Sequence, residues 1–126
     1  MTTLQSLPAL GAALEGGIFA GLTTKPDGTH CAVVLLPDKP DARLKWQHAV
    51  EWAQGLQAEL PTRPVSALLF ANARAQFERE WHWTSEVHED DGSFAWFRNF
   101  GYGSQSYYRK SYEGRARAVR LIPLTA

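Results

Sequence analysis

The chain has 126 residues, enough for one hydrophobic core but not for two. Its hydrophobic content of 44% and charged content of 21% are those of an ordinary globular protein, and one cysteine excludes an internal disulfide. The net charge is zero, yet residues 93–126 carry six basic and one acidic side chain, against seven basic and twelve acidic in residues 1–92. The basic third could meet an acidic partner. Alternatively its arginines pair with the chain's own acids, which we expect for Arg117 and Arg120.

The N-terminal segment has no pattern of a signal peptide, because the first ten residues lack a basic region and a long apolar run. No run of about 18 apolar residues occurs, so we expect no membrane insertion. The localisation expected is the host-cell cytoplasm or a virion assembled there. Residues 1–15 show weak periodicity, although Leu4, Leu7, Leu10 and Leu14 could form a short helix.

Two strands are predicted next, over residues 16–24 and 30–36. Between them, Pro26, Asp27 and Gly28 predict a tight turn, because Pro fixes φ and Asp-Gly accepts left-handed positions. The second strand is apolar from Cys31 to Leu36, which predicts burial on both faces and a buried thiol.

Two helices follow. Asp41 is the expected N-cap of the first, which we expect to end at Pro61. Its apolar residues recur every three or four positions, as in an amphipathic helix: Trp46, Ala49, Val50, Ala53, Leu56 and Leu60. The second helix is predicted from Pro64 to about Ala75, with Val65, Leu68, Leu69 and Phe70 inward.

The C-terminal part is predicted to be strands. They cover residues 81–85, 93–100 and 115–122, with a loop at 87–92 and a hairpin turn at 101–105. Alternation places Phe94, Trp96 and Phe100 on one side of the middle strand. The order of elements predicts an α+β fold in a single domain, residues 1–126.

Residues 102–112 have the composition of a binding surface, because tyrosines, serines and basic residues are concentrated there. Tyrosine offers a rigid amphipathic contact, while the alternative is that it simply favours strands. On a strand, Tyr107 and Tyr108 must point to opposite faces, so we expect one buried and one exposed. The candidate binding residues are Tyr102, Ser104, Gln105, Tyr107, Tyr108, Arg109, Lys110 and Tyr112.

Several motifs together resemble one family. They are Asp27-Gly28, Leu44-Lys45-Trp46-Gln47-His48-Ala49, Leu60-Pro61-Thr62-Arg63, Trp83-Thr84-Ser85, Ala95-Trp96, Phe100-Gly-x-Gly-x-Gln105, Lys110 and Arg117-Ala118-Val119-Arg120. Their order is similar to that of the Lcl C-terminal domain family of bacterial and phage proteins, a domain of unknown function. The sequence departs from the family at Ala58-Glu59, where Trp-Arg is usual, and at Pro64-Val65-Ser66.

The resemblance implies a C-type-lectin-like fold, with two helices flanking a mainly antiparallel sheet. It also implies that the N- and C-terminal strands close this sheet, so that residues 17–24 lie beside residues 115–122. A phage or prophage setting is implied as well.

Catalytic and metal chemistry is poorly supported. The cluster formed by His82, Glu86, His88 and Glu89–Asp91 has no third imidazole or thiol, although its acids could hold calcium. We interpret these acids as solvated and expect no metal and no cofactor. No nucleophile elbow or phosphate-binding loop occurs, so we expect no enzyme.

Two functions from different classes remain. The first is a phage- or prophage-associated recognition domain that binds a protein or glycan partner through residues 102–112. The second is a small intracellular effector that inhibits a host protein. Single-stranded nucleic acid is a weaker third partner, because a sequence pI near 6.9 is low for such a binder.

Overall fold

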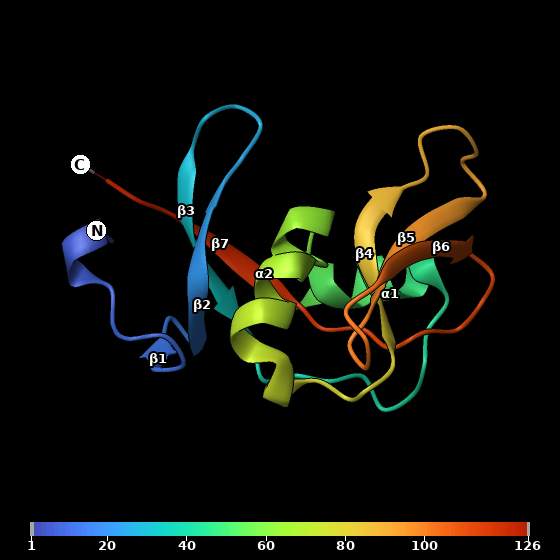
Figure 1. The fold of residues 1–126 in the computed structure, drawn as a ribbon, viewed down its shortest axis with the longest axis horizontal. Coiled ribbons are helices and arrows are strands. Elements are labelled where there is room, and N and C mark those ends of the chain that lie inside the picture. The colour runs from blue at the N-terminus through green and yellow to red at the C-terminus, as the bar shows by residue number, and fades with distance from the viewer. Residues whose placement is uncertain (1, 126) are drawn as a thin grey trace.

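The computed structural model describes residues 2–125, which form two antiparallel sheets with two helices packed between and around them (Figure 1). A four-stranded sheet has the order β1-β2-β3-β7, with β1 at Ala13–Leu14, β2 at Gly17–Thr24, β3 at His30–Leu35 and β7 at Val119–Pro123. A three-stranded sheet consists of β4 (Trp81–Val87), β5 (Phe94–Asn99) and β6 (Gln105–Arg109). The helices are α1 (Trp46–Gly55) and α2 (Arg63–Ala73), with short 3-10 turns η1 (Leu4–Ser6) and η2 (Arg74–Gln76). The α+β class is therefore confirmed.

The β2–β3 hairpin forms where the sequence predicts it. Asp27 Oδ1 accepts a hydrogen bond from the Thr29 N–H at 2.9 Å, and Gly28 adopts a φ of +91°. All residues from Cys31 to Leu36 are buried, as predicted. The two faces of β3 pack into two different cores. Val33 and Leu35 pack with α2, whereas Val34 and Leu36, the residue after the strand, pack with α1 and the three-stranded sheet.

The predicted pairing of residues 17–24 with residues 115–122 is wrong. The last strand, β7, pairs with β3 from Leu35↔Val119 to Cys31↔Pro123, and β2 pairs with the opposite edge of β3. The buried strand β3 needs hydrogen-bonded partners on both edges, and it therefore separates the first strand from the last. Residues 115–118, predicted as strand, instead carry the chain from the three-stranded sheet towards β7.

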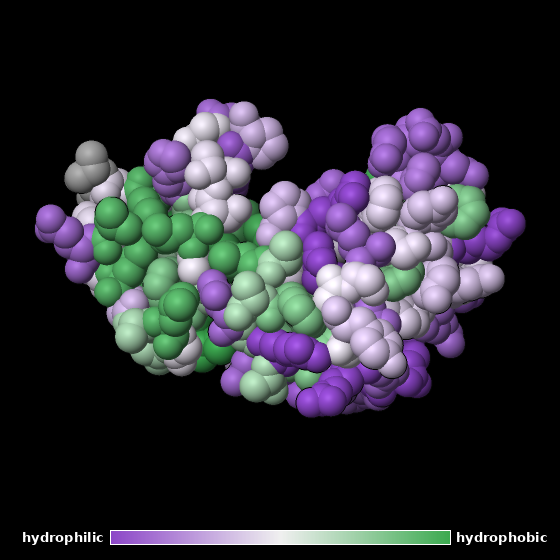
Figure 2. All heavy atoms as spheres, viewed as in Figure 1, coloured by the Kyte–Doolittle hydropathy of each residue, from purple (hydrophilic) through white to green (hydrophobic). Residues whose placement is uncertain are grey.

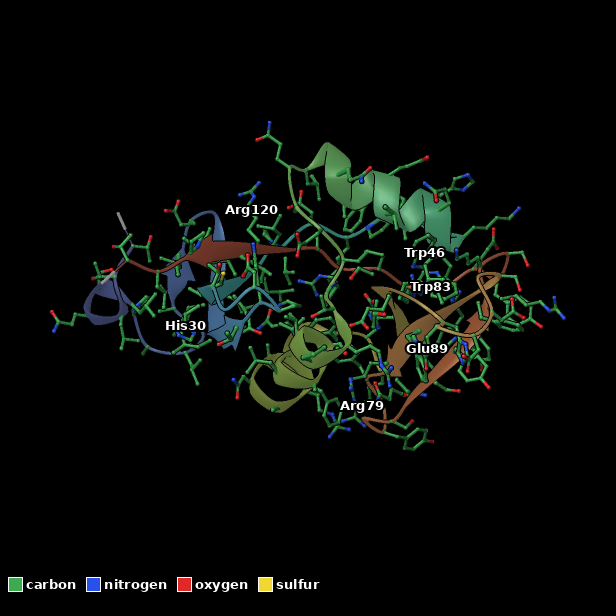
Figure 3. The ribbon with its side chains drawn as sticks, turned by 90° about the horizontal axis from the view of Figure 1, so that it is seen from above. His30, Trp46, Arg79, Trp83, Glu89 and Arg120 are labelled. Carbon is green, nitrogen blue, oxygen red and sulfur yellow. The ribbon has the colours of Figure 1, made fainter. Side chains whose placement is uncertain are left out.

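The first helix is shorter than predicted. It begins after Lys45, which makes no side-chain cap, so the N-cap role predicted for Asp41 is wrong. It ends at Gly55, well before Pro61, and Gln57 takes a φ of +55°. The residues after the helix adopt an extended conformation, because Glu59 exchanges two backbone hydrogen bonds with Val119. Seen from above, α1 and α2 lie on opposite sides of the molecule (Figure 3).

The second helix begins at Thr62, whose Oγ1 accepts a hydrogen bond from the Val65 N–H at 3.3 Å. Such a cap satisfies a backbone donor that has no partner within the helix. Val65 and Leu69 are buried, whereas Leu68 and Phe70 are half-buried. The short helix suggested near the N-terminus is only the 3-10 turn η1. Among residues 2–125, no helix is long and apolar enough to cross a membrane.

Candidate binding face

Strand β6 is an edge strand, and all five of its residues are exposed. The Asn99 N–H donates to the Ser104 carbonyl at 2.7 Å and the Lys110 N–H donates to the Ser93 carbonyl at 2.9 Å. In an antiparallel pair, every second residue turns its backbone groups towards the partner strand. The N–H and C=O groups of Gln105 and Tyr107 therefore point away from β5, to the free edge of the sheet.

The hairpin turn between β5 and β6 is built around Asn99, whose Oδ1 accepts from the backbone N–H groups of Gly101 (2.7 Å) and Tyr102 (3.2 Å). Gly103 has a φ of +85°, and a Cβ there would lie 2.6 Å from the Phe70 ring. Both constraints require glycine. The turn leaves Tyr102 87% exposed, with no aromatic neighbour among residues 2–125.

The two faces of β5 and β6 differ in chemistry. One face, which we call the outer face, carries Phe94, Trp96 and Arg98 on β5 opposite Arg109, Tyr107 and Gln105 on β6. Ala95 and Phe97 of β5 point to the other face and are buried. Phe94 and Trp96 share a face as predicted. Phe100 does not join them, because it follows the strand and is stacked on Phe77 at 3.9 Å within the α2 core.

Aromatic rings cluster on the outer face around Tyr107. Its ring centroid lies 4.3 Å from that of His88, 5.2 Å from Trp96 and 5.6 Å from Phe94. The Trp96 ring is covered by the Arg63 guanidinium, with Cζ 3.6 Å from the ring centroid. Its indole N–H donates to the Glu89 carboxylate at 3.2 Å. The pKa of Glu89 is lowered first by a hydrogen bond from its own backbone and then by this bond from Trp96. These contacts fix the rings in one arrangement.

Three arginines surround these rings. Arg109 lies with Cζ 5.3 Å from the Phe94 centroid, while Arg63 and Arg98 both donate to the Gln105 side-chain oxygen, at 3.1 Å and 3.4 Å. Within residues 2–125, none of the three forms a salt bridge. The outer face is therefore aromatic and carries three arginines, with Glu89 at its border.

The other predicted binding residues lie on the opposite side of the sheet. Tyr108 stacks on Phe97 with centroids 4.5 Å apart, and Tyr112 packs on Tyr108 at 5.4 Å. Lys110 Nζ lies 4.6 Å from the Trp46 ring of α1, which Figure 3 shows near Trp83 between α1 and this sheet. The predicted set is thus divided. Gln105, Tyr107 and Arg109 lie on the outer face, Tyr108, Lys110 and Tyr112 lie on the reverse side, and Tyr102 and Ser104 lie in the turn.

The expectation of one buried and one exposed tyrosine is wrong in part. Tyr107 and Tyr108 do point to opposite faces, but both remain accessible, at 42% and 37%. The physical reason is that β6 is an edge strand, so no neighbouring strand covers either ring from the free side.

Contrary to expectation, Arg117 and Arg120 form no salt bridge with any acid among residues 2–125. Buried Arg117 donates to the carbonyls of Gln76 and Leu36, and burial lowers its pKa. Arg120 donates to the carbonyls of Leu56, Gln57 and Glu15. The carbonyls of Leu56, Gln57 and Gln76 lie at the ends of helical segments, where acceptors lack partners within their own element. Leu36 follows β3, and Glu15 lies in the turn between β1 and β2. Arg115, in the same third of the chain, does contact acids, at 3.1 Å from Glu80 and 3.9 Å from Glu78.

The acidic loop brings His88, Glu89 and Asp90 together, with one potential ligand atom from each within 4.8 Å of the others. The acids on either side of Asp90 already accept protein hydrogen bonds: Glu89 from Trp96, and Asp91 from the Ser93 N–H at 3.0 Å and hydroxyl at 2.6 Å. The pKa of Asp91 is lowered by these two bonds. A solvated loop with internal hydrogen bonds accounts for these acids.

A notch lies beside the outer face, visible at the top of Figure 2 between the β2–β3 turn and the β4–β5 loop. Its cavity has a volume of about 550 Å³ and is lined by Pro26, Arg63, Pro64, Ala67, Glu86, Arg98 and Gln105. Sequence reasoning missed Arg63 and Arg98 as site residues. Arg63 lies in α2, 42 residues before Gln105, so no local pattern links the two. Arg98 lies opposite Gln105 in the β5–β6 hairpin, but its contact with Arg63 depends on the packing of α2 against β5.

An apolar groove of about 930 Å³ lies on the β2 side of α2, where Figure 2 shows hydrophobic surface. It contains Leu4, Leu22, Leu68 and Leu124, and none of its lining residues is an acid, a lysine or an arginine. Its polar lining consists of His30 and three threonines, Thr23, Thr24 and Thr125.

No protein-family model matches this sequence, and no curated protein matches it either. The resemblance to the Lcl C-terminal domain family accordingly stays a prediction.

Proposed function

We propose that this chain is a non-enzymatic recognition domain that binds a protein or glycan partner through its outer face. The observation that carries the proposal is the set of fixed aromatic rings around Tyr107, bordered by Arg63, Arg98 and Arg109 without acidic partners among residues 2–125. Tyr, Trp and Arg are the residues that contribute most at binding interfaces, because they bury large areas and also form hydrogen bonds.

The free edge of β6 supports the same proposal. Gln105 and Tyr107 direct unpaired backbone donors and acceptors outward, beside the side chains of the outer face. A partner segment could add main-chain hydrogen bonds there, while the rings and arginines select its side chains. Arg109 at the end of the strand restricts nonspecific pairing, since charge on an edge strand opposes aggregation.

The proposed setting is a phage or prophage, which rests on the resemblance in sequence. A recognition domain of this kind would belong to a virion. A host-directed effector would use the same face in the cytoplasm. Purified particles separate the two: presence of the chain in the virion favours the first role, and a copurifying host protein without virion association favours the second.

The test of the face is a pull-down from host extract with the wild type and matched variants. Tyr107→Ala and Arg109→Ala should each reduce partner recovery by about tenfold or more, the loss expected at an interface hot spot. Tyr112→Ala, on the reverse side of the sheet, is the control and should retain the partner. Equal recovery by Tyr107→Ala and wild type, with the loss appearing in Tyr112→Ala, would place recognition on the reverse side. Nuclease treatment identifies a nucleic-acid partner.

A further inference from the structure

Arg63 and Arg98 form an unusual pair, because two cations share one neutral acceptor. Arg63 begins α2 and Arg98 lies on β5, yet Arg63 Nε and Arg98 Nη2 both donate to Gln105 Oε1, at 3.1 Å and 3.4 Å. Like charges at such separation repel each other. Neither arginine forms a salt bridge among residues 2–125, although Glu86 lines the same notch.

Both guanidinium groups are held in place by other contacts. Arg98 Nε donates to the Ser66 hydroxyl at 2.9 Å, and its Nη1 donates to the Gly103 carbonyl. The Arg63 guanidinium lies over Trp96, with Cζ 3.6 Å from the ring centroid, and its Nε donates to Gln105. A guanidinium has five N–H donors, and these contacts leave several of them unused on each arginine. The donors are therefore fixed before any ligand arrives.

Glu86 is the acid in the notch, and its carboxylate is already engaged. Its Oε2 accepts the Arg63 backbone N–H at 2.7 Å, where it stabilises the first turn of α2. The pKa of Arg98 is lowered first by burial and then by the positive charge of Arg63, so the two cations disfavour each other. An anion placed between the two guanidinium groups would offset this repulsion.

We propose that the notch between α2 and the β5–β6 hairpin binds an oxyanion through Arg63 and Arg98. Planar guanidinium groups pair with carboxylate, sulfate or phosphate oxygens through two parallel hydrogen bonds, so all three anions fit the donors. The inference deepens the proposed function, because it assigns to the partner an anionic group that enters the notch beside the outer face.

The cavity of about 550 Å³ accommodates more than a single anion. The anion could belong to an acidic side chain, an acidic sugar or a phosphorylated or sulfated group. Acetate represents the first two sources, and phosphate and sulfate represent the third. Binding of acetate alone would indicate a partner with a carboxylate group. A preference for sulfate or phosphate would indicate a partner with a sulfated or phosphorylated group.

The experiment titrates the isolated protein with sodium acetate, sulfate and phosphate against sodium chloride at equal ionic strength. The readout is the ¹⁵N–¹H signal of the Arg63 and Arg98 Nε groups. We expect a saturable shift of both signals with at least one oxyanion. Arg63→Gln should weaken that binding roughly tenfold, the usual effect of losing one charge-assisted hydrogen bond. Arg79→Gln is the control, since Arg79 is exposed and does not line the notch, and it should bind within about twofold of wild type.

Nonsaturable shifts, or equal weakening in Arg63→Gln and Arg79→Gln, would overturn the anion site. The proposed function is tested separately by the pull-down with Tyr107→Ala. Loss of the partner in that variant, combined with no anion binding by wild type, refutes the anion site and leaves the recognition face standing. Anion binding by wild type, combined with unchanged partner recovery by both Tyr107→Ala and Arg63→Gln, refutes the recognition face and leaves the anion site standing.

Discussion

Tyr107 and Tyr108 are neighbours with similar exposure, yet their rings touch different parts of the molecule. Tyr108 packs on Phe97, which is buried, and on Trp81, which borders the same core. The rings around Tyr107 are His88, Phe94 and Trp96, all only half-buried. Accessibility alone does not distinguish the two residues, whereas their neighbours do.

We therefore expect Tyr108→Ala to lower the free energy of unfolding by roughly 1–2 kcal/mol, because it removes aromatic contacts with the core. Tyr107→Ala should cost less than about 1 kcal/mol, because its neighbours stay solvated after the change. Urea denaturation of both variants measures the difference. A larger loss in Tyr107→Ala would show that the outer face contributes to stability more than the core side.

His82 is a buried imidazole whose charge the fold disfavours. Its Nδ1–H donates to the Glu80 carbonyl at 2.9 Å, while Phe77 and Phe100 pack edge-on against the ring. Burial lowers its pKa to about 4, although the Glu78 carboxylate at 3.7 Å from Nε2 acts in the opposite direction. Burial prevails because the ring is only 3% exposed.

The free energy of unfolding should therefore depend on pH through His82. Between pH 6.5 and about 4 the unfolded chain binds a proton at this imidazole and the folded chain does not, so stability falls as pH falls. The loss attributable to His82 reaches about 3 kcal/mol at most. His82→Gln should flatten this part of the stability curve, measured by urea denaturation at pH 4.5 and 7. An equally steep curve in the variant would assign the dependence to other groups.

At the scale of elements, β3 is the strand on which the four-stranded sheet depends. Its two edges are hydrogen-bonded to β2 and β7, and both of its faces supply core residues. Its apolar run of six residues made its burial predictable from sequence. The run could not show which strand lies on each edge, because register and neighbour are set by tertiary packing and not by local periodicity.

Ending the chain at Gly114 should abolish cooperative folding, because it removes β7 and the buried Arg117 and exposes one edge of β3. The control ends the chain at Pro123, which keeps all of β7 and should melt cooperatively. Thermal melts followed by circular dichroism compare the two. A cooperative transition in the shorter chain would show that β3 needs no partner on that edge.

The helices show where local signals fail. The apolar stripe of α1 is correct at Ala49 and Ala53, both buried, but its predicted end near Pro61 ignores the extended pairing of Glu59 with Val119. The N-cap predicted at Asp41 rests on residue type alone. In the structure residues 41–45 are held instead by long-range contacts, such as Leu44 pairing with Gly114.

At the scale of the molecule, the candidate site was predictable in composition but not in arrangement. Residues 102–112 do form an exposed strand and turn, and alternation correctly separates Tyr107 from Tyr108. The partners of Tyr107 come from the β4–β5 loop and β5, and the arginine pair joins α2 to β5. Such contacts depend on how the elements pack, which one sequence does not encode in any local pattern.

A chelator should leave the stability of the whole molecule unchanged. His88, Glu89 and Asp90 lie close enough to hold an ion, but Glu89 is hydrogen-bonded to Trp96 and the loop is exposed. The prediction is that EDTA shifts the melting temperature by less than about 1 °C, since no folding energy comes from metal. A large drop reversed by calcium or zinc would identify this loop as a metal site.

The last prediction concerns cooperativity between the two sheets. One core joins β3 to α1, β4 and β5, and the other joins β2, β3, β7 and α2 to Phe100, so each core contains residues from the part of the molecule that holds the other sheet.

The chain provides a separate probe for each sheet. All five tryptophans lie in α1, β4 and β5, whereas the one cysteine, Cys31, is fully buried in β3. Coincident transitions of independent probes are the test of two-state unfolding. Tryptophan fluorescence and thiol labelling of Cys31 should therefore give the same urea midpoint. A lower midpoint for thiol labelling would mean that the four-stranded sheet opens while the candidate binding face remains folded.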